Sequence, residues 1–261
     1  MAQQKTVIID AGHGGVEPGA IYEGRREKDD TLRLALAVGQ ILERNGVDVV
    51  YTRVQDVFDS PYEKAAIANR SGADFFVSIH RNSMPEPNTA SGVETLVYED
   101  SGIRHLLAKN INDALHRMTG YANLGIKERP GLVVLRDTQM PAVLVEAGFI
   151  NSDADNQVFD EKFDAMANAI AQGILKTIRE EEEAVPEYYQ IQVGAYQDRA
   201  SAVKEVQALK NEGFPAFLVY QAPWYRVRVG AFLNLDNAAN MEQRLRQSGY
   251  PTLMVKERAV Y

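Results

Sequence analysis

The stretch Val7-Ile-Ile-Asp-Ala-Gly-His-Gly-Gly15 decides the fold, because it is a short apolar run that ends at a histidine followed by small residues. The same arrangement returns in Phe75-Phe-Val-Ser-Ile-His-Arg-Asn82. A third run, Ala142-Val-Leu-Val-Glu-Ala-Gly-Phe149, has Glu146 in the equivalent position. Short apolar runs are consistent with strands of a parallel sheet that is buried on both faces. Residues just past the carboxyl ends of such strands converge on one crevice, so His13, His80 and Glu146 are predicted to meet there.

Apolar strand-like runs alternate with amphipathic helical patterns through the first two thirds of the chain. This order predicts an α/β fold in which helices sandwich a mainly parallel, twisted sheet. The expected strands are Lys5–Asp10, Val47–Thr52, Phe75–His80, Val93–Tyr98, Leu132–Leu135 and Ala142–Glu146. The expected helices are Asp29–Asn45, Pro61–Arg70, Ile103–Met118 and Asp160–Glu182.

Composition and charge exclude several classes of protein. The 261 residues carry a net charge of −8, which argues against general nucleic-acid binding. The chain contains no cysteine, so disulfides and thiolate zinc sites are excluded. No apolar run is long enough to span a membrane, and no signal peptide is visible at the N-terminus, so we expect no membrane association.

A run of glutamates, Glu180-Glu-Glu-Glu183, followed by Pro186 predicts a boundary between two domains. We expect a first domain over residues 1–180, a linker over 181–187 and a second domain over 188–261. Basic residues outnumber acidic ones from Tyr188 onward, whereas the preceding part is strongly acidic. This asymmetry indicates that the two domains have different partners.

The second domain is an internal repeat in which each half is predicted to form a strand, a helix and a strand. Tyr189 and Val193-Gly-Ala195 match Tyr225 and Val229-Gly-Ala231 at a constant offset. The result is a small α+β domain of βαββαβ order, with helices on one face of a four-stranded sheet. The open face is predicted to present a ligand platform; the alternative is a merely solvated face. Its candidate binding residues are Gln190, Gln192, Arg226 and Arg228.

The site in the first domain has the residue types of a catalytic zinc centre, which takes three nitrogen or oxygen ligands and leaves a position open for water. His13 and His80 supply two nitrogens. Glu27, just before the first helix, is the candidate third ligand; alternatively, it is only a first-turn acid favoured by the helix dipole. His105 and His116 lie off the apolar stripe of their helix and are expected to face solvent.

Glu146 is the candidate general base, because a carboxylate at a strand end beside a metal can move a proton between water and a leaving amine. The alternative is that it supports a metal-binding histidine. Arg81 and Asn82, beside the second histidine, are candidate substrate contacts, and Arg81 has the further alternative of folding away.

Four motifs in order, Asp10-Ala-Gly-His-Gly-Gly15, Gly24-x-x-Glu27-Lys28, Ser78-Ile-His-x-Asn82 and Leu144-Val-Glu-Ala-Gly-Phe149, resemble the zinc-dependent N-acetylmuramoyl-L-alanine amidases of the amidase_3 family. The resemblance covers roughly residues 5–180. It implies one zinc ion held by His13, Glu27 and His80, with Glu146 as the catalytic glutamate. The implied reaction is hydrolysis of the peptidoglycan amide between N-acetylmuramic acid and L-alanine. Arg81 departs from the pattern, since a smaller residue is common there.

The repeat domain resembles the SPOR module, which implies recognition of peptide-free glycan strands. Amidases with such modules resemble enzymes of spore-forming bacteria that lyse the mother-cell wall. Some of these lack a signal peptide, so we expect action on the cell wall after non-classical release, or a mature form. Some amidases carry a helical insertion that blocks the zinc. The segment between His80 and Glu146 is too short for one, so no obligatory protein activator is expected.

Two other functions are compatible with the same residues. A zinc peptidase that cuts within the stem peptide would use identical metal chemistry. A non-catalytic wall-binding protein with a relic site would keep the second domain as its working part. A nucleotide-binding role for Gly12–Gly15 is disfavoured, because the spacing is wrong and no Lys-Ser/Thr follows.

Overall fold

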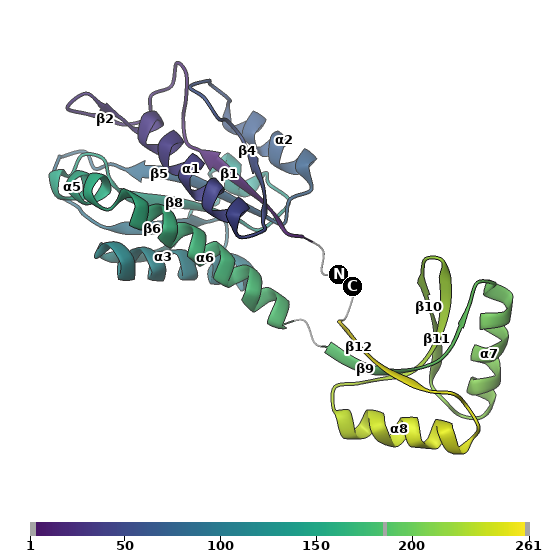
Figure 1. Ribbon diagram of the computed structural model, residues 1–261. Coiled ribbons are helices and arrows are strands. Elements are labelled where there is room, and N and C mark those ends of the chain that lie inside the picture. Colours follow the sequence, from purple (N-terminus) through teal and green to yellow (C-terminus); the bar gives the residue numbers. More distant parts are fainter. Residues whose placement is uncertain (1–3, 185–186, 259–261) are drawn as a thin grey trace. The chain divides into compact units, whose positions relative to one another are not determined.

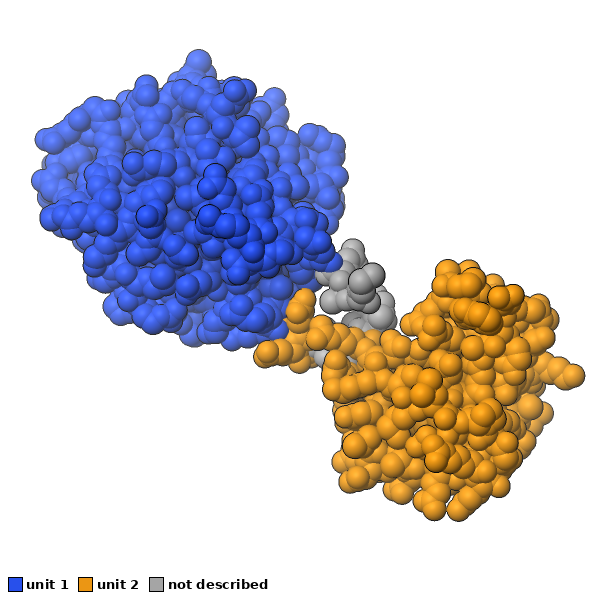
Figure 2. Space-filling view, in the orientation of Figure 1, with its two compact units in different colours: residues 1–181 blue, residues 182–261 orange. Residues whose placement is uncertain are grey.

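The computed structural model describes residues 4–184 and 187–258. The chain forms two compact units, Met1–Glu181 and Glu182–Tyr261, shown separately coloured in Figure 2. The larger unit is the predicted α/β sandwich and the smaller is the predicted α+β domain.

The larger unit is organised around a six-stranded sheet whose strand order is β4-β1-β5-β8-β6-β7 (Figure 1). All neighbouring strands are parallel except β8 and β6, which run antiparallel, so the prediction of a mainly parallel sheet is confirmed. The strands are β1 (Thr6–Ala11), β4 (Asp48–Tyr51), β5 (Phe75–Asn82), β6 (Val93–Val97), β7 (Asn123–Glu128) and β8 (Ala142–Phe149). A two-stranded ribbon of β2 (Ile21–Tyr22) and β3 (Arg25–Arg26) precedes the first helix.

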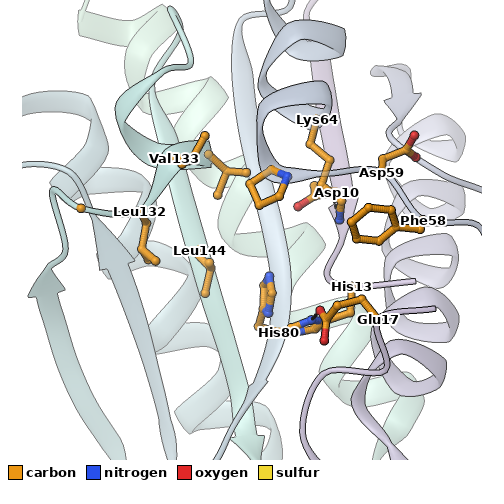
Figure 3. A pocket seen from close by; sticks show the side chains of 13 residues that line it. Asp10, His13, Glu17, Phe58, Asp59, Lys64, His80, Leu132, Val133 and Leu144 are labelled. Carbon is orange, nitrogen blue, oxygen red and sulfur yellow. Dashed lines mark hydrogen bonds and ion pairs between the residues drawn. The ribbon is translucent and has the colours of Figure 1, made fainter. Parts of the chain in front are cut away.

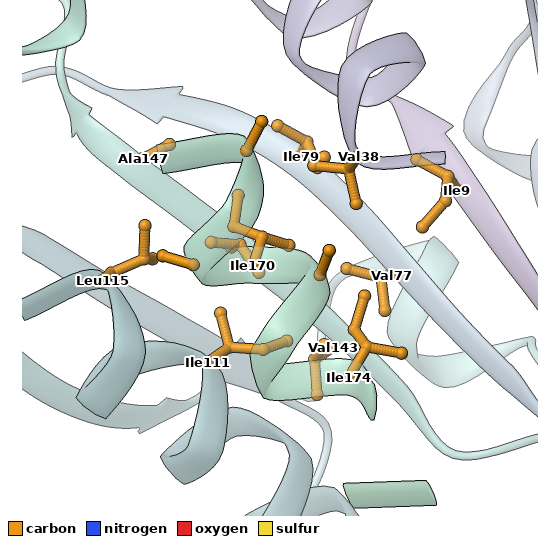
Figure 4. Packing of buried hydrophobic residues seen from close by; sticks show 14 of the residues in the cluster. Ile9, Val38, Val77, Ile79, Ile111, Leu115, Val143, Ala147, Ile170 and Ile174 are labelled. Atoms are coloured by element: carbon orange, nitrogen blue, oxygen red, sulfur yellow. The ribbon is translucent and has the colours of Figure 1, made fainter. Parts of the chain in front are cut away.

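Helices cover both faces of this sheet. One face packs against α1 (Glu27–Arg44), α3 (Gly102–Thr119), α5 (Asp153–Glu161) and α6 (Phe163–Ala184). The other face packs against α2 (Pro61–Ser71) and α4 (Val133–Arg136). Successive side chains of β5 alternate between the two faces. Val77 and Ile79 pack with Ile111 and Ile170 on the α1, α3, α5 and α6 side (Figure 4), and Phe76 packs on the α2 and α4 side.

The secondary structure differs from expectation in several places. Leu132–Leu135 is not a strand, since its last three residues belong to the helical turn α4. A run of only four apolar residues cannot distinguish a buried strand from a buried helical turn. The final helix is two helices, α5 and α6, with Lys162 between them. The edge strand β7 was missed, because its sequence Asn-Leu-Gly-Ile-Lys-Glu has only two apolar residues and contains a glycine.

The predicted linker over 181–187 is also wrong in part. Helix α6 continues to Ala184, because glutamate is a good helix former, and β9 already begins at Glu187. Pro186, which was expected to stop the helix, lies outside the described residues.

The smaller unit has the predicted βαββαβ order and an antiparallel sheet arranged β10-β11-β9-β12. Apolar residues of one sheet face, such as Ile191 and Val227, pack against Leu209 and Leu245 of the two helices. Its elements are β9 (Glu187–Tyr196), α7 (Arg199–Asn211), β10 (Ala216–Gln221), β11 (Trp224–Phe232), α8 (Leu235–Gln247) and β12 (Leu253–Arg258). Among the described helices of the whole chain, none is long and apolar enough to cross a membrane.

Candidate active site

The three residues predicted to meet at the strand ends do so. His80 of β5 and Glu146 of β8 are direct register partners, and the backbone N–H of Gly12 donates to Ile79 O across the end of β1 and β5. His13 follows at the start of the next loop. The ring centroids of His13 and His80 lie 4.8 Å apart, with the rings edge to face.

Glu27 completes the group from the first turn of α1, which begins two residues earlier than predicted. Its two carboxylate oxygens are shared between the histidines: Oε1 lies 2.9 Å from His80 Nδ1 and Oε2 lies 3.0 Å from His13 Nε2. One ligand atom from each residue lies within 4.8 Å of the others. Glu27 is therefore both a first-turn acid and a member of the site.

Two glycines make this close approach possible. A Cβ on Gly12 would lie 2.5 Å from the His80 ring. A Cβ on Gly19 would lie 2.6 Å from both Glu27 Oε2 and His13 Cδ2, and Gly19 also has a φ of +68°. Any side chain at either position would displace a ligand side chain.

Buried cations and a hydroxyl hold the loop that carries His13. Arg53 Nη2 and Thr31 Oγ1 donate to the carbonyl of Gly12 at 2.9 Å and 2.7 Å. Lys28, which is buried, donates to the carbonyl of Gly15 at 2.8 Å. His13 itself has a φ of 59°, a left-handed conformation that this network maintains.

The electrostatics of the group favour an anionic Glu27. Burial opposes its ionisation, but hydrogen bonds from His13 and His80 hold the pKa of Glu27 well below its usual range. Burial likewise opposes protonation of His13, yet Glu27 and Glu17 raise its pKa to about 9. The Glu27 carboxylate thus lies between the two imidazole rings, which is the position that a bound metal would share with it.

The donor set fits a zinc ion. Catalytic zinc sites use histidine nitrogen and carboxylate oxygen ligands, at about 2.0–2.2 Å from the metal. The His13, Glu27 and His80 donors already face one another, and His80 and His13 remain about one fifth exposed, at 19% and 22% of their side chains. That exposure leaves room for a fourth ligand.

Glu146 differs from Glu27 in its surroundings. Burial, with Glu27 and Glu94 nearby, raises the pKa of Glu146 to about 7, and the histidines only partly offset this. Its Oε2 is buried without a hydrogen-bond partner among the described residues. A carboxylate with a free oxygen and a pKa near neutrality can both accept and return a proton.

A pocket of about 290 Å³ opens beside the histidines, on the sheet face that carries α2 and α4 (Figure 3). Beneath it the buried carboxylate of Asp10 pairs with Lys64 Nζ at 2.8 Å and accepts from Thr52 and Ser78. The remaining wall is largely apolar and is formed by Phe58, Pro61, Leu132, Val133, Val134 and Leu144.

The structure corrects one candidate substrate contact. Arg81 points to the opposite face from His80, because successive side chains of a strand alternate, and its side chain is 0% exposed. Asn82 lies on the site's face, but its amide donates to Glu94 Oε1 at 3.0 Å. His105 and His116 are exposed on α3, as predicted.

Two carboxylates of the site were missed by the sequence analysis. Glu17 contacts His13 Nδ1, and Glu94 is the register partner of Glu146 on β6 and pairs with Lys127. The signals were present: Glu17 follows His13 within one loop, and Glu94 is the lone acid in the apolar run Val93–Val97.

In the smaller unit, Gln190, Gln192 and Arg226 lie half-buried on the sheet face away from the helices. Arg228 is different, with only 1% of its surface exposed. Its Nη1 donates to Gln190 Oε1 at 2.9 Å, and its Nη2 pairs with Glu257 at 2.7 Å. The prediction that Arg228 is an exposed binding residue is therefore wrong, since cross-strand neighbours bury and neutralise it.

Comparison with known proteins decides the family. Residues 7–176 match the family model described as N-acetylmuramoyl-L-alanine amidase, Amidase_3, and residues 185–256 match the SPOR domain. The chain belongs to the Amidase_3 family. A sporulation-specific N-acetylmuramoyl-L-alanine amidase of Bacillus subtilis is 33% identical over 218 residues, which cover 82% of this chain and 84% of that protein.

Solved structures of Amidase_3-like enzymes have the same fold as the larger unit. An N-acetylmuramoyl-L-alanine amidase from Clostridium difficile 630 superposes with a TM-score of 0.64 at 34% identity, covering 67% of this chain and 97% of that one. The CwlD amidase of Clostridioides difficile, solved in complex with the GerS lipoprotein, gives 0.62 at 31% identity over 67% and 99%.

Proposed function

We propose that this Amidase_3 protein hydrolyses the peptidoglycan amide between N-acetylmuramic acid and L-alanine, using one zinc ion held by His13, Glu27 and His80. The observation that carries the proposal is the convergence of these three ligands next to Glu146, which has a free carboxylate oxygen. A purely structural metal site would not need a carboxylate with an unpaired oxygen beside its ligands, whereas a hydrolytic site does.

The residues of the site divide the chemistry between them. A zinc ion held by the three ligands would polarise the scissile carbonyl and activate water. Glu146 accepts the proton of the attacking water and returns it to the L-alanine nitrogen as the C–N bond breaks. The pocket beside the histidines, whose wall is largely apolar, is where we propose that the substrate binds.

Product identification tests the proposal. Purified protein is incubated with peptidoglycan, and the newly exposed amines are labelled and identified. We expect L-alanine, with activity lost in chelator and restored by zinc. A mid-peptide residue as the new amine would instead establish a peptidase, and full activity of Glu146→Ala would show that catalysis lies elsewhere.

For the smaller unit we propose binding of peptide-free glycan strands through the face that carries Gln190, Gln192 and Arg226. Such strands are the product of the amidase reaction, so the module would keep the enzyme on wall already being processed. Sedimentation with peptidoglycan before and after amidase digestion tests this. Binding that does not increase after digestion would contradict it.

The site of action is then the cell wall, and similarity to a sporulation-specific amidase favours lysis of the mother-cell wall as the setting. We further propose that no protein activator is required, because the side chains of His13 and His80 keep solvent exposure. Activity that appears only after a second protein is added would disprove this.

A further inference from the structure

Arg81 is buried immediately beside the candidate metal ligand His80, in a position where it cannot reach substrate. A fully buried guanidinium is costly unless its N–H groups are satisfied. Arg81 therefore needs a set of partners, and the identity of those partners points to its role.

The first set of partners is on β8, directly after Glu146. The register between β5 and β8 shifts between His80↔Glu146 and Asn82↔Phe149, so Ala147 and Gly148 together oppose Arg81. Such an irregularity takes carbonyls out of the ladder. Arg81 Nε donates to Gly148 O at 3.3 Å and Nη2 donates to Phe149 O at 3.2 Å. The guanidinium thus replaces lost ladder bonds and fixes the strand after Glu146.

The second set of partners is on α1, at the turn that carries Glu27. Arg81 Nη1 donates to Asp30 Oδ2 at 2.6 Å, and the backbone N–H of Arg81 donates to Glu27 Oε1 at 3.0 Å. Asp30 follows Glu27 within one helical turn, so the ion pair holds the helix start against β5. One residue therefore contacts Glu27 itself and the turn that orients it.

The remaining contacts fix the guanidinium plane. Nη2 also donates to Asn156 Oδ1 at 2.8 Å, and the guanidinium lies 4.2 Å from the centroid of the Phe159 ring. Both residues belong to α5, which packs under the end of β8. The planar guanidinium of Arg81 is bonded to β8, α1 and α5 at the same time, so it links the positions of these three elements.

We infer that Arg81 is a positioning residue that locks the His80, Glu27 and Glu146 segments into the geometry of the metal centre. The inference rests on the proposed function, because it assumes that the three ligands hold zinc. It does not make Arg81 catalytic: the side chain lies on the far face of the sheet and acts through the backbone of β8 and the first turn of α1.

Zinc affinity of the full-length protein tests the inference, measured by competition with a chromophoric chelator. Arg81→Met keeps the length of the side chain but removes its donors, and we expect at least tenfold weaker zinc binding, the range seen when supporting partners of metal ligands are removed. Arg81→Lys keeps the charge near Asp30 but loses the bonds to both β8 carbonyls, and we expect an intermediate loss.

The matched control is Ile111→Ala, which removes buried volume from the core on the same side of the sheet, away from the ligands. It should lower thermal stability yet bind zinc as the wild type does. Hydrogen exchange of metal-free protein gives a second readout: Arg81→Lys should speed exchange at the β8 backbone N–H groups after Glu146, and Ile111→Ala should not.

The outcomes separate the two ideas. Wild-type zinc affinity and unchanged β8 exchange in the Arg81 variants, with a wild type that binds zinc, would overturn the positioning role alone. A wild type that binds no zinc, or binds it equally after His13→Ala, would overturn the proposed metal centre. If Arg81→Met does not fold, Arg81→Lys carries both measurements.

Discussion

His80 and Glu146 are direct partners in the parallel ladder between β5 and β8. Both side chains therefore point to the same face of the sheet and start from backbones that are hydrogen-bonded neighbours. The candidate ligand and the candidate base are thus placed by two central strands of the sheet rather than by loops.

This pairing predicts that the two roles can be separated by substitution. Glu146→Gln keeps the size of the side chain but cannot accept the proton, so peptidoglycan hydrolysis should fall by about 10²–10⁴-fold. Zinc content, measured by elemental analysis of the purified variant, should stay at the wild-type level because Glu146 is not in the ligand group. Activity within a few-fold of wild type would remove Glu146 from the mechanism.

Gly19 and Gly24 offer a test of steric access to the ligands. Both have positive φ values, +68° and +81°, but only Gly19 lies against the site, whereas a Cβ on Gly24 meets nothing within 4 Å. Alanine at either position should cost about 1–2 kcal/mol of backbone strain. Gly19→Ala alone should also displace Glu27 and His13 and weaken zinc binding.

Isothermal titration of both metal-free variants with zinc makes the comparison. Gly24→Ala is the control for backbone strain, since it changes φ compatibility without touching a ligand. Equal zinc affinities for the two variants would show that the close approach at Gly19 is not needed for binding.

The sequence predicted the sheet and the convergence of His13, His80 and Glu146 because both depend on local patterns. Apolar runs ending at His13, His80 and Glu146 fix the strand ends, and parallel pairing then brings them together. The capping box at Ser60, with the Ser60 hydroxyl accepting from the N–H of Glu63, shows how local signals set the helix that lines the pocket.

What could not be predicted depends on register and on contacts between distant segments. The burial of Arg81 depends on the register irregularity in β8 opposite it, and no local sequence pattern indicates that irregularity. Arg228 alternates onto the open face as predicted, but pairing with Glu257 of β12 buries it. Glu94 became a neighbour of Glu146 only through the antiparallel pairing of β6 with β8.

The buried pair of Asp10 and Lys64 predicts acid sensitivity of the larger unit. Although burial opposes ionisation of Asp10, its pKa is lowered by Lys64, with hydrogen bonds from Ser78 and Thr52. Because the folded pKa lies below the unfolded value, the pair stabilises the fold above about pH 4 and this contribution is lost as pH falls further.

Asp10→Asn should therefore lower the free energy of unfolding by about 3–5 kcal/mol at pH 7, because the buried Lys64 ammonium then lacks its counter-charge. Urea unfolding at pH 7 and at pH 3 measures this, and the difference from wild type should shrink at pH 3. A difference that is the same at both pH values would mean that the charge of Asp10 does not stabilise the fold.

The open face of the smaller unit yields a prediction from two arginines of one strand. Arg226 is half-buried, and its side chain forms no hydrogen bond or ion pair among the described residues, so its exposed part is free to contact a ligand. Arg228 already bonds Gln190 and Glu257.

Arg226→Ala should weaken binding to peptide-free glycan about tenfold, equivalent to about 1.4 kcal/mol, with no change in the melting temperature of this unit. Arg228→Ala should instead destabilise the unit by about 2 kcal/mol. Sedimentation with digested peptidoglycan and thermal melts measure the two effects; loss of binding in Arg228→Ala with unchanged melting would restore Arg228 as a direct contact.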